Sequence, residues 1–387
     1  MITPATPATF AALWPKALPG DTLTLAPGSY GDLMIRGKAC DPPLRIIATD
    51  PAQPPVFNTV GLVYTSGVIF EDVVIAYKPT LTTLEATPVL RIDQSSRVSW
   101  LRGEISSGPA VNGLAPDGTT IGATNTGNVV GYPCGRVSVT TSEDVLIEGV
   151  NIHHLGRAVN LGVRAKRITI RGCDIHHTRR TAILGGASDL TIENNQIHDF
   201  SPWELGKTPY GDHCDFIALW TDATNIERNV RIVGNRMVNG AATTIMGVWF
   251  AGPAGFDNVE FRDNYLAGTD HQGLMMTSVR GGSVTGNTLT GRAGIILRDG
   301  VTGVTGANNV YSTYSDFANG ATGNLIAPPV ASLIPPPDPK DVRIAELEGL
   351  LAASVVACQE ADALAAARAG ELAQATARIA AARLALQ

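Results

Sequence analysis

The segments ITIRGCDI (168–175) and LTIENNQI (190–197) are two copies of one short pattern that recurs along the chain. Each copy has alternating apolar residues, a bend that contains Gly, Asn or Asp, and then another apolar residue. Such alternation predicts a half-buried β-strand, and the bend residues predict a sharp turn before the next strand. The other copies are VIFEDVVI (68–75), VSWLRGEI (98–105), VLIEGVNI (145–152), VRIVGNRM (230–237), VEFRDNYL (259–266) and GSVTGNTL (282–289).

The spacing of these copies limits the fold. Successive copies begin 30, 47, 23, 22, 40, 29 and 23 residues apart, so the basic repeat is 21–23 residues and longer intervals hold loops. A unit this short has no room for a helix beside its strands, which argues against leucine-rich and helical repeats. Stacked copies form a coil of parallel strands around a continuous core. A second strand is predicted in several repeats, at 158–161, 181–184, 215–219, 273–276 and 294–297.

The bend of the repeat holds the same residue type in consecutive copies. Four asparagines, Asn195, Asn235, Asn264 and Asn287, occupy equivalent positions, and Val150 and Cys173 fill that column earlier. An Asn there tolerates a tight backbone angle and can bond the same group one repeat away. The sequence therefore predicts a ladder of stacked Asn side chains.

With these repeats, the opening stretch ALPGDTLTLAPGSYGDLMIRG (17–37) resembles the entry segment of the pectin-lyase-like β-helix superfamily. The resemblance implies an all-β, right-handed parallel β-helix with an N-terminal cap over residues 1–326. This fold hosts lyases, hydrolases, epimerases, phage tailspikes and non-catalytic adhesins, so it does not fix an activity. Neither the carboxylate and Arg-Ile-Lys signature of polygalacturonase-like hydrolases nor a calcium-dependent lyase motif has a clear counterpart here.

The chain after the repeats has a different composition. Residues 327–340 hold six prolines and predict a stiff linker. Residues 341–387 carry a heptad register, which predicts an α-helical coiled coil that joins copies of the chain. A solitary Ala-rich helix docked on the body is the alternative. The residues expected to mediate oligomerisation are Ile344, Leu347, Leu351, Cys358, Leu372, Ile379 and Leu386.

Composition excludes several classes of partner and site. Hydrophobic residues at 44% and charged residues at 17% exclude disorder of the whole chain, and a net charge of −6 argues against nucleic acid. The N-terminus lacks a basic segment and a long apolar run, so neither a Sec-type signal nor membrane insertion is expected. Five cysteines without paired short spacing predict free thiols rather than a zinc site or disulfides: Cys40, Cys134, Cys173, Cys214 and Cys358.

All seven histidines lie between residues 153 and 271. His153, His176 and His198 follow equivalent Ile residues in successive repeats and should stack as a ladder. The adjacent column is His154, His177 and Asp199. Packing alone explains such a ladder, and a metal or substrate site is the alternative. Parallel rows of side chains do not make a closed coordination shell, so no metal is predicted.

A second polar set mixes imidazole, guanidinium and carboxylate groups at the start of the later strands. This mixture suits sugars, because Arg binds carboxylates in bidentate fashion and a carboxyl pair can supply acid and base. A solvated seam without chemistry is the alternative. The predicted catalytic residues are Asp212, His213, Asp215, Asp270 and His271. The predicted cationic substrate contacts are Arg157, Arg179, Arg180, Lys207 and Arg292.

A long insertion between residues 199 and 229 is aromatic and polar. Inserted loops on solenoids commonly form the binding surface, and aromatic faces pack on sugar C–H groups. Trp203, Glu204 and Tyr210 are therefore predicted to contact substrate, with Trp203 the best candidate for exposure. Trp220 and Trp249 fit a core position equally well.

The solenoid, linker and self-associating tail together resemble a bacteriophage tailspike or tail fibre. That resemblance implies a homotrimer that binds a host cell-surface glycan, and it places the protein on the virion, outside the cell when it meets the host. Contact with other virion proteins is expected through the C-terminal helix. The alternatives are a free polysaccharide lyase or glycoside hydrolase and a non-catalytic structural fibre. No cofactor is expected, except calcium if the protein is a lyase.

Overall fold

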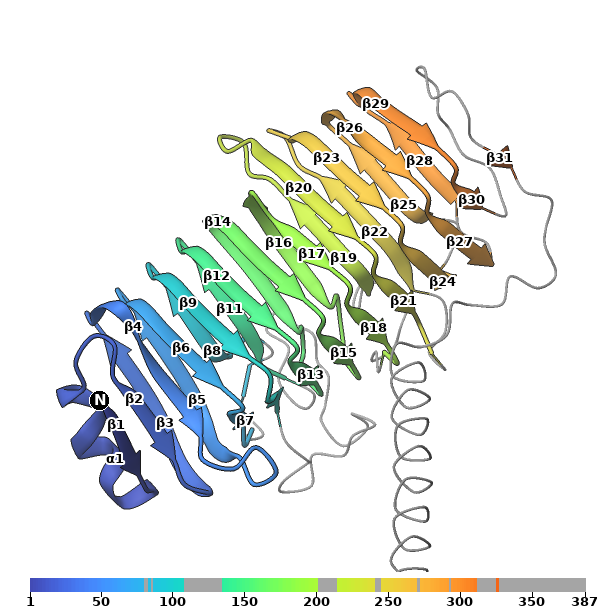
Figure 1. Cartoon of the computed structure of the whole chain (residues 1–387). Coiled ribbons are helices and arrows are strands. Elements are labelled where there is room, and N and C mark those ends of the chain that lie inside the picture. The colour runs from blue at the N-terminus through green and yellow to red at the C-terminus, as the bar shows by residue number, and fades with distance from the viewer. Residues whose placement is uncertain are drawn as a thin grey trace, which may run out of the picture. The chain divides into compact units, whose positions relative to one another are not determined.

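The computed structural model describes residues 1–79, 83–84, 86–107, 134–200, 214–240, 245–269, 272–291, 294–311 and 325–326 (Figure 1). All of these lie in the first compact unit of the chain, Met1–Leu333. Short strands make up nearly all of its regular structure, and every strand pair is parallel. The linker 327–340 and the predicted coiled coil 341–387 lie outside the described residues, so both stay predictions.

The strands stack in three columns, here called sheets B, A and C in the order in which each coil passes through them. Sheet B contains β3 (Gly28–Arg36), β5 (Pro55–Val63), β8 (Pro88–Asp93), β11 (Arg136–Thr140), the start of β14 (Val159–Arg171), β16 (Ile183–Ser188), β19 (Asp215–Trp220), β22 (Met246–Ala251), β25 (Gln272–Thr277) and β28 (Gly294–Arg298). Sheet A contains β2 (Thr22–Leu25), β4 (Ala39–Ala48), β6 (Ser66–Glu71), β9 (Ser96–Leu101), β12 (Glu143–Glu148), the end of β14, β17 (Thr191–Glu193), β20 (Glu227–Val233), β23 (Phe256–Arg262), β26 (Val279–Thr285) and β29 (Thr302–Ala307). Sheet C contains β7 (Val74–Ala76), β10 (Glu104–Ser106), β13 (Asn151–His153), β15 (Asp174–His176), β18 (Gln196–His198), β21 (Arg236–Val238), β24 (Tyr265–Thr269), β27 (Thr288–Gly291), β30 (Val310–Tyr311) and β31 (Leu325–Ile326). The eight copies of the sequence pattern are confirmed as the passage from sheet A to sheet C.

The bend between sheets A and C explains the Gly, Asn or Asp in each copy of the pattern. In five of these bends one residue takes a left-handed backbone conformation, with φ between +55° and +66° at Gly149, Gly172, Asn194, Gly234 and Asp263. Glycine adopts this conformation freely, and Asn and Asp tolerate it better than other residues. The pattern therefore marks the corner of the coil as well as its strands.

The predicted asparagine ladder is confirmed at this same bend. Asn235 Oδ1 accepts hydrogen bonds from the backbone N–H and the side-chain amide of Asn195, at 3.0 and 2.9 Å. The same contacts join Asn235 to Asn264 and Asn264 to Asn287, and Asn309 extends the ladder by one coil. The side chains are at most 1% exposed, so each coil fixes the next through buried, satisfied amides.

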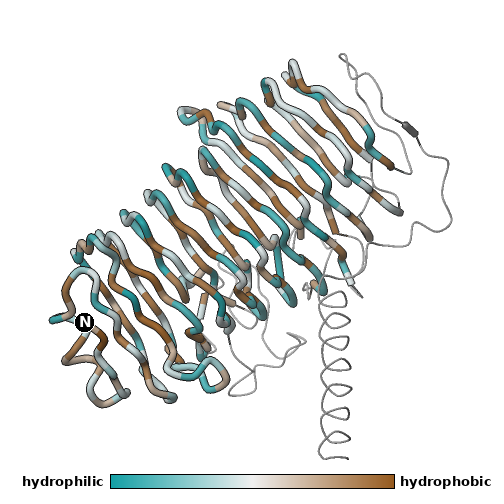
Figure 2. The backbone as a smooth tube through the Cα atoms, in the orientation of Figure 1, coloured by the Kyte–Doolittle hydropathy of each residue, from teal (hydrophilic) through white to brown (hydrophobic). Residues whose placement is uncertain are grey.

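Apolar side chains from the three sheets fill the inside of the coil, and Figure 2 shows hydrophobic and hydrophilic residues alternating along the strands. In sheet A, Phe70 stacks on Trp100 with ring centroids 4.6 Å apart. At the N-terminal end, β1 (Ile2–Ala5) pairs with β2, and α1 (Pro7–Leu13) covers the core. Its Phe10 packs edge-on against Phe57 at 5.8 Å. These two elements lie at the N-terminal end of the core.

From β14 onward sheet B differs from the prediction in two places, and its earlier strands β5, β8 and β11 were not predicted. The predicted strands aligned residue 158 with 181, but β14 pairs Val159 with Ile183, because one extra residue enters after Arg180. Strand β22 was not predicted at all. Its run MGVWFA has apolar residues on both sides of the strand, which hides the alternation.

Four cysteines, Cys40, Cys134, Cys173 and Cys214, are buried free thiols, as predicted, and Cys358 lies outside the described residues. Burial raises the pKa of the Cys173 thiol to about 12. In the described part of the chain, no helix has the length and apolar character that crossing a membrane requires.

Candidate functional site

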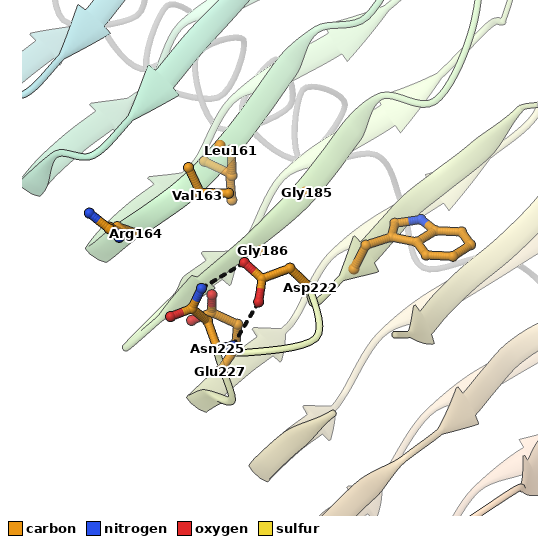
Figure 3. A pocket seen from close by; sticks show the side chains of 10 residues that line it. Leu161, Val163, Arg164, Gly185, Gly186, Asp222, Asn225 and Glu227 are labelled. Carbon is orange, nitrogen blue, oxygen red and sulfur yellow. Dashed lines mark hydrogen bonds between the residues drawn. The ribbon is translucent and has the colours of Figure 1, made fainter. Parts of the chain in front are cut away.

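A cleft of about 180 Å³ opens where three successive coils turn from sheet B into sheet A (Figure 3). We call it the corner cleft. It is lined by Leu161, Gly162, Val163, Arg164, Gly185, Gly186, Trp220, Asp222, Asn225 and Glu227. Its volume is below the roughly 300 Å³ of small-molecule pockets in general, so it suits a single sugar-sized ring rather than a buried chain.

Glycines form one wall of the corner cleft, and any other residue type would bring its Cβ too close to the neighbouring backbone there. Gly185 has φ +110°, and an added Cβ would lie 1.8 Å from the carbonyl oxygen of Leu161 on the preceding coil. At Gly186, an added Cβ would lie 2.6 Å from the carbonyl oxygen of Trp220. The coil of β16 therefore turns tightly through two glycines, while the next coil turns through the longer loop 221–226. The cleft forms between these two turns because they differ in length.

Asp222 fixes that longer loop. Its Oδ1 accepts hydrogen bonds from the backbone N–H groups of Thr224 and Asn225, both at 2.7 Å, and its Oδ2 accepts one from Asn225 Nδ2 at 2.6 Å. These bonds, the backbone bond from Thr224 first, lower the pKa of Asp222 to about 2. Asp222 therefore stays ionised at the edge of the cleft.

Glu227 has the opposite environment. It is 8% exposed, and burial raises the pKa of its carboxyl, with the charge of Asp222 acting in the same direction. Ser188 Oγ donates a hydrogen bond to Glu227 Oε2 at 2.7 Å and itself accepts one from the backbone N–H of Arg228 at 3.1 Å. Within the described residues, no hydrogen bond reaches Oε1, and the side chain lines the cleft. Two carboxyl groups with pKa values moved apart thus share one cleft.

An aromatic side chain completes the corner cleft. Trp220 is 44% exposed and packs edge-on against Trp249, with ring centroids 4.6 Å apart. Val163 is also exposed, and Arg164 is the one basic residue among those that line the cleft. An indole held by a second indole offers a fixed apolar surface, and the carboxyl and amide groups beside it bind hydroxyl groups.

A second polar cluster lies at the ends of the sheet C strands β13, β15 and β18, in two of the coils that form the cleft and in the coil before them. His153, His176 and His198 stack with ring centroids 4.8 and 5.2 Å apart, and His154 stacks on His177 at 4.9 Å. The predicted ladder and its adjacent column are therefore confirmed. We call these five residues the histidine array.

Hydrogen bonds inside the array use nearly every ring nitrogen. Nδ1 of His153 lies 2.6 Å from Nδ1 of His154, and the pair His176 and His177 repeats this distance. On the other side of the rings, Nε2 of His153, His176 and His198 contacts Glu104, Asn151 and Asp174, respectively, at 3.1, 2.9 and 2.7 Å. In a contact between two ring nitrogens, one nitrogen carries the proton and the other accepts it, so each pair orients its two rings.

Three imidazoles of the array resist charging. Burial lowers the pKa of His154 to about 4 and that of His176 to about 3, and it also lowers the pKa of His177. Burial acts the same way on His198, but hydrogen bonds to Asp174 and Asp199 outweigh it and raise the pKa of this residue. Among the described residues, no group of three or more His, Cys, Asp or Glu side chains is arranged to hold a metal ion. The array is a set of internally paired side chains.

Residues 135–311 match the family model described as "Right handed beta helix region". The body of the chain is a right-handed parallel β-helix. The predicted right-handed parallel β-helix is thereby confirmed.

No curated protein matches the sequence. Among solved structures, pectate lyase Pel9A has a TM-score of 0.45 and 12% identity, over 84% of this chain and 81% of that one. An alginate lyase from Paenibacillus sp. has a TM-score of 0.36 and 13% identity, over 83% and 96%. The A-module of the mannuronan C-5 epimerase AlgE6 of Azotobacter vinelandii has a TM-score of 0.37 and 12% identity, over 83% and 91%.

On this β-helix, the structure describes four of the predicted site residues. Asp215 is 2% exposed and accepts a hydrogen bond from Thr181 Oγ1 at 2.9 Å. Arg179 is 1% exposed, so like Asp215 it lies beneath the surface. Arg157 and Arg180 are half-buried neighbours on successive coils, because the Arg180 N–H donates to the carbonyl of Gly156 at 2.9 Å. None of the four lines the corner cleft.

The remaining predicted site residues lie outside the described residues, and their roles stay predictions. They are Asp212, His213, Asp270 and His271 of the catalytic set, and Trp203, Glu204, Lys207, Tyr210 and Arg292 of the substrate-binding set.

The corner cleft was not predicted from the sequence. Trp220, which fits a core position by pattern, is exposed because β19 ends there and the chain leaves the sheet. The available signal was the stretch TDATNIE (221–227), which adds residues between two strands exactly where neighbouring coils have Gly. Asp followed by Thr and Asn is typical of a turn that the Asp side chain stabilises. Such a turn at a coil corner indicates a longer connection than in the neighbouring coils.

Proposed function

We propose that the protein binds a cell-surface polysaccharide through the corner cleft. The observation that carries the proposal is the cleft itself: Trp220, whose indole is exposed, lines it together with the ionised Asp222 and the buried Glu227, and its volume fits one sugar ring. Sugar rings present C–H groups on their faces and hydroxyl groups at their edges, and this cleft offers a partner for each.

Three copies of the chain would raise the strength of such binding. A single cleft of this size makes few contacts, and linked copies convert weak contacts into avidity. The heptad register in residues 341–387 supports self-association, and the resemblance to a bacteriophage tailspike or tail fibre implies three copies. We therefore propose this role, on the virion and attached through the C-terminal helix to other virion proteins.

Binding is tested with the full-length protein on immobilised polysaccharides. The probes are purified neutral polymers (dextran, galactan and mannan), uronate polymers (alginate and polygalacturonate) and lipopolysaccharide and capsule preparations from bacteria. We expect binding to at least one probe that Trp220→Ala weakens. The matched control is Tyr64→Ala, since Tyr64 is an aromatic residue of similar exposure, 54%, on a distant coil. Binding to none of the probes, or equal loss in both variants, would contradict the proposal.

The trimer is tested by sedimentation equilibrium of the full-length protein. We expect three times the mass of one chain, and we expect Leu351→Asp combined with Leu372→Asp to give one chain mass, because both residues belong to the predicted apolar seam. A wild-type protein that sediments as a monomer would contradict the coiled coil.

A further inference from the structure

We propose that Glu227 is a proton donor and that the protein hydrolyses a glycosidic bond of the polysaccharide held in the corner cleft. This inference rests on the proposed function, because it needs the sugar to occupy that cleft. It adds an activity and assigns the residue that performs it.

Geometry first selects Glu227 over the other carboxyl groups of the surface. The side chain is more than nine-tenths buried and lines the cleft, and only one of its two oxygens has a hydrogen-bond partner among the described residues. Ser188 holds Oε2, and its own orientation is fixed by the N–H of Arg228. The other oxygen, Oε1, is therefore left for a ligand, and the carboxyl is held in one orientation.

Most other acidic side chains on sheet A are committed to ion pairs. Glu71 contacts Arg45 and Arg102, Glu143 contacts Lys166 and Arg167, and Glu260 contacts Arg231 and Arg262. These pairs lower the pKa of each of the three carboxyl groups, so they carry no proton near neutral pH. Burial without a basic partner gives Glu227 the opposite property, since it raises its pKa and favours the protonated form.

Hydrolysis of a glycosidic bond also needs a negative charge near the reacting carbon, and Asp222 supplies it in the same cleft. Bonds from its own loop keep it ionised, and a carboxylate beside the reacting carbon stabilises the positive charge that develops there. The two groups also oppose a uronate ligand, because only one basic residue, Arg164, lines the cleft with them. The geometry therefore points to a neutral sugar at the cleavage position.

The step balances without a cofactor. Glu227 gives its proton to the glycosidic oxygen as the bond from that oxygen to the anomeric carbon breaks, and the departing sugar leaves as an alcohol. Water adds to the anomeric carbon and releases a proton to the solvent at the open side of the cleft. Glu227 takes a proton back from solvent, so one glycosidic bond and one water become two hydroxyl groups.

The test uses the full-length protein, Glu227→Gln, and the polysaccharide probes named above. We expect each probe that binds through Trp220 and is neutral to gain reducing ends over time. Glu227→Gln should bind that probe with unchanged affinity and cleave it roughly 10²–10⁴-fold more slowly, because Gln keeps the shape and lacks the proton. Glu193→Gln is the matched control, since Glu193 is a half-buried Glu at the end of β17 that does not line the cleft. It should cleave at the wild-type rate.

The pH profile gives a readout that a structural role would not move. The rate in wild type should fall as pH rises through the raised pKa of Glu227, because the donor loses its proton. The residual rate of Glu227→Gln should not show that fall. Thermal unfolding of both variants checks that the β-helix is intact.

The outcomes separate the two proposals. A polymer that binds through Trp220 and gains no reducing ends overturns the hydrolase and leaves the binding function standing. Cleavage that Glu227→Gln retains, or products with the ultraviolet absorbance of an unsaturated uronate, overturns the role of Glu227. If no polymer binds, the proposed function fails, and the hydrolase fails with it.

Discussion

The histidine array and the corner cleft share two coils of the β-helix, yet they use polar side chains in opposite ways. In the array, ring nitrogens contact other rings, Asn or carboxylates at 2.6–3.1 Å. The polar groups are therefore hydrogen-bonded to one another within the fold. In the cleft, Trp220 is 44% exposed and Glu227 keeps an oxygen without a partner among the described residues. Clustering of titratable residues therefore does not by itself mark a binding site. The sites to examine are those where buried polar groups stay unpaired at an open surface.

The largest effect is expected from removing the indole of the cleft. Trp220→Ala should weaken polysaccharide binding about 30-fold or more, since a buried aromatic contact at a binding site is typically worth 2 kcal/mol or more. The unfolding temperature should stay close to that of wild type, because the side chain is half outside the fold. Titration calorimetry and thermal unfolding of the same sample measure both. A loss of stability with unchanged affinity would assign Trp220 to the core instead.

The array should show the reverse pattern. His198→Leu removes the imidazolium between Asp174 and Asp199, and the loss of a hydrogen bond to the largely buried Asp174 costs about 1–3 kcal/mol. We expect a lower free energy of unfolding in urea and no change in polysaccharide affinity. An equal loss of affinity would mean that the array contacts the ligand after all.

A smaller effect on binding is expected from the glycine wall. Gly186→Ala places a Cβ 2.6 Å from the Trp220 carbonyl oxygen and 3.4 Å from Glu227 Cγ, so the loop must shift. The polysaccharide affinity should fall about threefold to tenfold, or roughly 1 kcal/mol. Gly172→Ala, at a bend where an added Cβ has no close neighbour within the described residues, is the control for backbone strain alone. Equal affinities in the two variants would show that the wall does not position the cleft.

The smallest expected effect is a change in the unfolding temperature with pH. The pKa values of His154, about 4, and His176, about 3, lie below the ordinary value of 6.5, so the unfolded chain binds protons more readily. The stability from these groups is complete above pH 6.5 and is lost as pH falls toward 4. The raised pKa of His198 acts in the opposite direction and partly offsets the loss. We expect Tm to fall by a few degrees between pH 6.5 and 4, and by less in His176→Phe, which keeps a stacked ring without the titration. An equal fall in both proteins would assign the acid sensitivity elsewhere.

Most of the β-helix could be predicted because each repeat contains residue types with strong preferences for one backbone conformation or for burial. The left-handed bend requires Gly, Asn or Asp, the core requires alternating apolar residues, and the Asn ladder requires one residue type in register. The histidine array followed from the same register. The corner cleft did not, because it arises from unequal turn lengths on adjacent coils. The exposure of Trp220 and the burial of Glu227 depend on those turn lengths. The pattern of residues within a single repeat therefore does not predict either one.

The most direct test of the central claim is a crystal structure of the protein with an oligosaccharide prepared from a polymer that it binds. We predict a sugar ring packed on Trp220, with hydroxyl or glycosidic oxygens within hydrogen-bond distance of Asp222 and Glu227. A saccharide bound elsewhere on the β-helix, with the corner cleft filled only by water, would contradict the account.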